Sequence, residues 1–83
     1  MAPPLATADA FTAIAEPGRR EVLSAIAAGG GRRDVTWLVG ELGWPQPRVS
    51  KHLGVLREAG LISVVRQGRR RVYSLNGPRL RPV

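Results

Sequence analysis

The sequence predicts a mainly α-helical fold with a small β-hairpin, an α+β arrangement of four helices followed by a two-stranded wing. Up to Gly60 the apolar residues recur at helical spacing, and beyond it they become β-branched and follow the pattern of strands. At 83 residues the chain fits one small domain. We expect a disordered N-terminus over residues 1–6, one domain over residues 7–76, and the truncated start of a C-terminal segment over residues 77–83.

The first two helices are predicted from apolar spacing and helix punctuation. Thr7 can cap a short helix whose apolar stripe is Ala10, Phe11, Ile14 and Ala15. Pro17 suits the first turn of a second helix that carries Val22, Leu23 and Ile26. Gly29, Gly30 and Gly31 end this helix, and three glycines in a row predict a flexible connection.

A helix, a turn and a second helix follow. Asp34 or Thr36 can cap a short helix that buries Leu38 and Leu42, and Gly43-Trp44-Pro45 makes a tight turn. The fourth helix begins near Pro45 or Gln46 and ends at Gly60, a left-handed cap. It carries Val49, Leu53 and Leu56 on one side, so it is amphipathic.

After Gly60 the pattern is that of a β-hairpin. Residues 61–65 and 71–75 are predicted strands, and residues 66–69 are the predicted turn. The Gln67-Gly68 pair can supply the positive φ angles that a short hairpin turn demands. This order of elements is that of a winged helix-turn-helix.

The charge of the chain points to a polyanionic partner. Thirteen Lys and Arg against six Asp and Glu give +7, and twelve of the thirteen are Arg, which suits bidentate contacts with phosphate and guanine. A GC-rich genome would also favour Arg over Lys. The location of the cations supports a nucleic-acid partner, because residues 48–71 hold seven of them and only one acid. Charge that protects an edge strand is the alternative for the wing.

If Val49 faces the core, the exposed side of the fourth helix can enter a major groove. Arg48 and Lys51 can then reach base edges, Ser50 can bond a phosphate, and Gly54 lets the backbone approach closely. An ordinary solvated helix face is the alternative. His52 is expected at the boundary of core and DNA, either as a phosphate donor or as a neutral, half-buried spacer. The predicted DNA-binding residues are Gln46, Pro47, Arg48, Ser50, Lys51, His52, Arg57, Arg66, Arg69, Arg70 and Arg71.

Composition argues against several other classes. Without cysteine, the sequence has no disulfide, thiolate metal site or thiol switch, and we expect neither cofactor nor metal. Ser50 and His52 diverge on a helix, and no paired carboxylates assist them, so no catalytic set is predicted. Trp37 and Trp44 are interpreted as packing residues, with stacking on single strands as the alternative. No signal sequence or membrane span is recognised, so the cytoplasm is expected.

The chain resembles the ArsR/SmtB family of bacterial transcriptional repressors. The similar segments are residues 16–23, 38–42, 46–53, 56–62, 68–70 and 72–75. The resemblance implies a homodimer that binds an inverted-repeat operator in double-stranded DNA and represses transcription. It also implies that the helix with Ser50 and His52 lies in the major groove and that the wing contacts the flanks.

Two departures from the family pattern concern the metal or ligand that the protein could sense. Where metal-sensing members carry a Cys-x-Cys pair, this sequence has Asp34 and Thr36. The family's final helix, which contributes to dimers and to a second class of metal site, is almost entirely missing. A metal- or ligand-responsive sensor, with its effector site outside this chain or between subunits, is therefore the alternative function. A winged helix that binds protein through a basic surface is a third.

Overall fold

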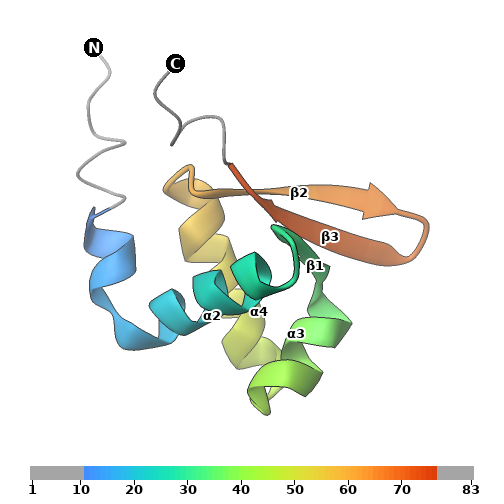
Figure 1. Ribbon diagram of the computed structural model, residues 1–83, viewed down its shortest axis with the longest axis horizontal. Helices are drawn as coiled ribbons and strands as arrows, with labels where there is room; N and C mark the ends of the chain where they lie inside the picture. Colours follow the sequence, from blue (N-terminus) through green and yellow to red (C-terminus); the bar gives the residue numbers. More distant parts are fainter. Residues whose placement is uncertain (1–10, 77–83) are drawn as a thin grey trace.

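The computed structural model describes residues 11–76, so the predicted disorder of residues 1–6 and the predicted segment 77–83 lie outside the described residues. Residues 11–15 are helical, and six elements follow: α2 (Pro17–Ala28), β1 (Arg32–Asp34), α3 (Val35–Leu42), α4 (Gln46–Glu58), β2 (Ile62–Gln67) and β3 (Arg70–Leu75). Figure 1 shows the helices gathered at one end and the β2–β3 hairpin projecting from them as a wing. The predicted fold class is confirmed.

The core lies where α2, α3 and α4 meet the base of the sheet. Its largest fully buried side chains are Val22, Ile26, Leu38, Val49, Leu53, Leu56 and Ile62. Leu42, predicted as buried, is partly buried and packs against this cluster. Of the two caps considered for α3, Asp34 serves, because its carboxylate accepts the Trp37 N–H at 2.8 Å.

The predicted apolar stripe of the first helix is wrong at Phe11 and Ala15, whereas Ile14 is partly buried, and the Thr7 cap and Ala10 lie outside the described residues. Ala13 is the buried residue there, at 1% exposure, whereas Phe11 is 67% exposed and Ala15 is also exposed. In a short segment rich in alanine several stripes fit the apolar spacing, so packing against the rest of the fold decides which side is buried. The Arg19 and Arg20 guanidiniums bond carbonyls of residues 12–15 and hold this segment against α2.

The sheet has three strands in the order β1-β3-β2, all antiparallel, which corrects the predicted two-stranded wing. In the added strand β1, Arg32 pairs with Ser74 and Asp34 with Val72. The glycines before it form a hydrogen-bonded connection instead of the predicted flexible one. Gly31 donates to the Ile26 carbonyl and accepts from the Leu75 N–H at 2.8 Å, so α2 is tied to the sheet.

The hairpin turn is shorter than predicted. Arg66 and Gln67 belong to β2, and Gln67 pairs with Arg70, so the turn consists of Gly68 and Arg69. Gly68 has φ +65°, and no non-glycine residue described has a positive φ. A positive φ at the first turn residue alone is typical of a type II′ turn, which suits the twist of paired strands. The expectation that Gln67 supplies a positive φ is therefore wrong.

The end of α4 is joined firmly to the wing. Gly60 takes the predicted left-handed conformation, with φ +80°. The Leu61 N–H donates to the Leu56 carbonyl and the Gly60 N–H to that of Arg57, both at 3.0 Å, which is a Schellman motif. From the end of β3, the Asn76 side chain donates to the Gly60 carbonyl at 2.8 Å. The base of the wing is thereby attached to the C-terminus of α4.

Candidate nucleic-acid interface

Buried residues set the rotation of α4. Val49, Leu53 and Leu56 are fully enclosed, so the opposite side of the helix faces solvent. No side chain among residues 11–76 caps its start, where the Arg48 and Val49 N–H groups donate to the Pro45 carbonyl. The exposed residues of the first two turns are Gln46, Pro47, Arg48, Ser50 and Lys51. These are predicted DNA-binding residues, and the structure brings them together on one polar, cationic face.

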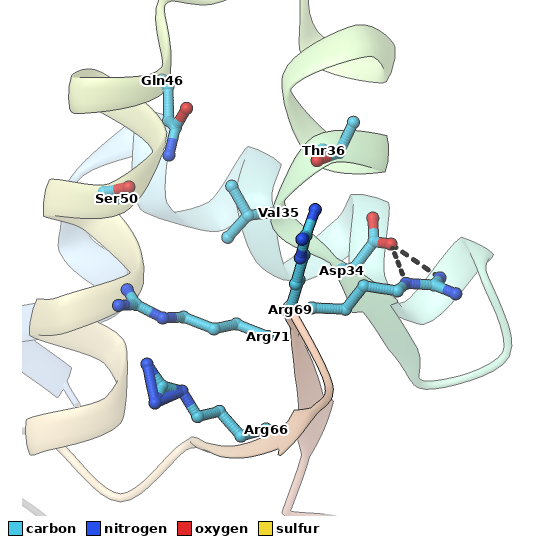
Figure 2. A pocket seen from close by; sticks show the side chains of 9 residues that line it. Asp34, Val35, Thr36, Gln46, Ser50, Arg66, Arg69 and Arg71 are labelled. Atoms are coloured by element: carbon cyan, nitrogen blue, oxygen red, sulfur yellow. Dashed lines mark hydrogen bonds and ion pairs between the residues drawn. The ribbon is translucent and has the colours of Figure 1, made fainter.

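A hollow of about 310 Å³ lies between α4 and the wing. Gln46 and Ser50 border it from α4, and Arg66, Arg69 and Arg71 extend into it from the hairpin (Figure 2). A second hollow of about 580 Å³ adjoins it, shares Ser50, Arg66 and Arg71, and is lined further by Gly54, Arg57, Val64 and Tyr73. Seven of the predicted residues therefore line one basic concavity, since Arg70 also borders the first hollow and Arg57 the second.

Arg70 differs from the other wing arginines because it already has a partner. Its guanidinium donates to the Asp34 carboxylate, at 2.9 Å from Nε and 2.7 Å from the nearer terminal nitrogen (Figure 2). The Trp37 N–H and then Arg70 lower the pKa of Asp34 below its ordinary value. Although Arg70 was predicted to bind DNA, its charge is occupied in joining β3 to the start of α3.

Arg48 is held in place by an aromatic ring. Its guanidinium carbon lies 3.9 Å from the centroid of Trp44, and Trp44 in turn packs against the core. A similar contact joins Arg33 to Trp37, at 4.2 Å. The prediction that the tryptophans are packing residues is confirmed, and both also orient an arginine. Both pairs are four residues apart and straddle the start of a helix, α3 for Arg33 and Trp37 and α4 for Trp44 and Arg48.

His52 lies in the interior and apart from the exposed face of α4. It is 8% exposed, packs against Gly18 and Trp44, and its Nδ1 lies 3.9 Å from a Glu16 carboxylate oxygen. Nδ1 has no hydrogen-bond partner in the described part of the chain. The expected half-buried position is thus a buried one, and the side chain is not placed to reach a phosphate directly.

Further observations bear on metals and membranes. Residues 11–76 contain no group of three or more His, Cys, Asp or Glu side chains that could hold a metal ion. Among the same residues, no helix has the length and apolar character needed to cross a membrane.

The helix-turn-helix of α3 and α4, with the basic hairpin beside it, defines a winged helix-turn-helix protein. The family model described as "Bacterial regulatory protein, arsR family" matches residues 16–64. The chain belongs to the arsR family of bacterial regulatory proteins.

Individual relatives agree with this assignment. The probable mercury resistance operon repressor of Streptomyces lividans is 39% identical over 77 residues, which are 93% of this chain and 60% of that protein. This chain therefore spans less than two thirds of that relative. An ArsR-like transcriptional regulator from Rhodococcus sp. RHA1 is 28% identical with a TM-score of 0.80, over 92% of this chain and 70% of the other. A homodimeric winged helix-turn-helix DNA-binding domain from Mycobacterium bovis is 27% identical with a TM-score of 0.81, over 90% and 68%.

Proposed function

We propose that this protein is a repressor that binds double-stranded DNA in a sequence-specific manner. The observation that carries the proposal is the shared orientation of two basic elements. The exposed start of α4, through Gln46 and Ser50, and four wing arginines, of which Arg70 is paired with Asp34, border the same concavity. In this arrangement α4 enters the major groove, while the wing follows the backbone or the adjacent minor groove.

Different residues serve affinity and sequence reading. Arg48 and Lys51 extend from the exposed face of α4 toward base edges, where a cationic donor pairs with guanine. Gln46 and Ser50, together with the wing arginines, bond phosphates and so fix the register of the protein on the duplex. Gly54 has no side chain between the helix and the DNA, and open space lies where a Cβ would stand.

The protein acts as a homodimer on an inverted-repeat operator. The homodimeric domain from Mycobacterium bovis, whose fold this chain shares, supports the proposed dimer. A two-fold axis in the protein requires two half-sites related by the same axis in the DNA. Chromosomal operators are the sites of action, so the protein works in the cytoplasm on the nucleoid.

The test is a selection of duplexes from a random pool, followed by measured affinities for the selected sequence and for a scrambled duplex of the same composition. We expect the selected duplex to bind about 10³-fold more tightly or better at physiological salt. Equal affinity for the two duplexes would contradict sequence-specific recognition. No binding of either would contradict the proposed function altogether and favour a protein partner for the basic surface.

A further inference from the structure

Two arginines of the wing face each other across the hairpin. The register of β2 and β3 places Arg66 directly opposite Arg71, so both side chains leave the same face of the sheet. Like charges directly opposite each other destabilise a pair of strands. Both side chains are exposed, and neither forms an ion pair or a hydrogen bond with another described side chain. The free protein therefore holds a repulsion that a bound anion would relieve.

The face that carries this pair looks toward α4. Figure 2 shows Arg66 and Arg71 extending toward α4, where Ser50 lies. These three residues are the ones common to the two hollows beside α4. Within the described part of the chain no acidic residue lines the larger hollow, and the carboxylate bordering the smaller one, Asp34, is engaged by Arg70 and the Trp37 N–H.

We infer that Ser50, Arg66 and Arg71 form a seat for a single phosphate group. In the complex it holds the phosphodiester that lies between the groove read by α4 and the groove followed by the wing. Two guanidiniums supply paired donors to the phosphate oxygens, and the serine hydroxyl supplies a further one. This inference rests on the proposed DNA binding and deepens it by assigning the ligands of one phosphate.

The first experiment measures how the affinity for the selected duplex depends on salt. Each phosphate neutralised contributes about −0.9 to the slope of log K against log salt. Because both arginines of a chain share one phosphate, the double variant Arg66→Gln/Arg71→Gln should lose about 0.9 of slope per bound chain, which is about 1.8 for the dimer on its operator, whereas two separate phosphates per chain would give about 3.6. Arg32→Gln is the matched control, since Arg32 is exposed on β1 and lines neither hollow beside α4. A loss of about 3.6 for the dimer, or one no larger than the control shows, would overturn the seat.

The second experiment uses inorganic phosphate and the free protein. At constant ionic strength, phosphate in place of chloride should raise the thermal midpoint of the wild type and of Arg32→Gln, and should raise that of the double variant less. In dilute chloride the double variant should unfold at the wild-type temperature or above, because the repulsion is removed. A lower midpoint there, or equal phosphate protection in all three proteins, would overturn the seat.

The two experiments separate this inference from the proposed function. A wild type that binds no duplex but is protected by phosphate through Arg66 and Arg71 would contradict DNA binding and support the seat. A wild type that binds the duplex, with a double variant indistinguishable from Arg32→Gln in both assays, would support DNA binding and refute the seat.

Discussion

At the scale of single residues, the arginines of this protein have different tasks despite equal charge. Arg19 and Arg20 bond the carbonyls of the first helix, Arg70 pairs with Asp34, and Arg48 stacks on Trp44. The sequence indicated where the cationic region lies. It did not show which arginines contact other groups of the protein and which remain free. That division depends on contacts between residues far apart in the chain, such as Asp34 and Arg70.

Arg48 is the residue on which sequence reading should depend most. We expect Arg48→Ala to weaken binding to the selected operator by about 1 to 3 kcal/mol, because a bidentate base contact is lost. The scrambled duplex should lose much less. Competition binding monitored by fluorescence anisotropy measures both affinities. Lys51→Ala should act in the same direction.

Arg69→Ala is the comparison for Arg48→Ala. Arg69 stands at the wing turn and extends into the hollow, so its loss should weaken all sequences alike and reduce the salt slope by about one for each bound chain. An Arg48→Ala variant that weakens both duplexes equally would show that Arg48 contacts phosphate and not a base.

Asp34 makes the stability of the protein depend on acid. The pKa of its carboxyl is lowered in the folded state by the Trp37 N–H and by Arg70, so its stabilising contribution is complete above the ordinary carboxyl pKa. That contribution is lost as the pH falls through the lower pKa of the folded protein. We expect Asp34→Asn to be less stable than the wild type at pH 7, and the difference to shrink below about pH 4.

Chemical unfolding of both proteins at a series of pH values measures this difference. Asparagine is also a good N-cap, so the comparison removes the ion pair and leaves the helix start capped. A difference that stayed constant from pH 7 to pH 3 would contradict the role of the ionised carboxylate.

At the scale of elements, the strength of the local pattern decided what could be predicted. The α4 helix was predicted well because Val49, Leu53 and Leu56 have regular spacing and Gly60 marks the end. β1 was missed because its three residues, Arg-Arg-Asp, have no apolar alternation and are held by pairing with β3. The buried face of the first helix was predicted wrongly because its alanine-rich sequence offers several equivalent apolar stripes. Tertiary packing selects one of them, and the local pattern does not show which.

Two helical glycines offer a matched test of how α4 meets DNA. A Cβ added at Gly54 of α4 or at Gly40 of α3 would meet no atom within 4 Å in the free protein. Alanine at either position should therefore stabilise the protein by about 0.5 to 1 kcal/mol. Gly54→Ala alone should weaken binding to the operator, because the added methyl group stands where the DNA approaches the helix.

Thermal unfolding and operator affinity of the two variants complete that comparison. If Gly54→Ala binds the operator as tightly as Gly40→Ala does, then α4 does not approach DNA closely at this turn. A loss of stability in Gly54→Ala would instead point to an effect on the fold itself.

At the scale of the whole molecule, shape and charge act together. The principal extents are 37 × 25 × 21 Å, and the hairpin projects along the long direction (Figure 1). In the proposed complex one such body covers one half-site, so pairing of two copies should raise the affinity for a duplex with two half-sites. Dimerisation was predicted from the family resemblance alone. The residue pattern of one chain does not reveal which surface a second copy would cover.

We expect the selected DNA to contain two inverted half-sites whose centres lie about 34 to 36 Å apart, or a multiple of that distance, along the duplex. Sequencing of the selected pool gives the repeat, and sedimentation of the complex gives two chains per duplex. Inserting five base pairs between the half-sites should reduce the affinity sharply, because it rotates them to opposite faces. A single half-site bound by one chain as tightly as the full duplex would contradict the dimer.

The attachment of the wing to the end of α4 also has a kinetic consequence. The Schellman turn at Gly60 and the Asn76 hydrogen bond join the helix and the hairpin before any DNA is present. The wing therefore loses little conformational entropy when the protein meets DNA, and it does not need to fold after that first contact. We expect association limited by diffusion and ionic strength, so differences between operators would appear in how long each complex survives.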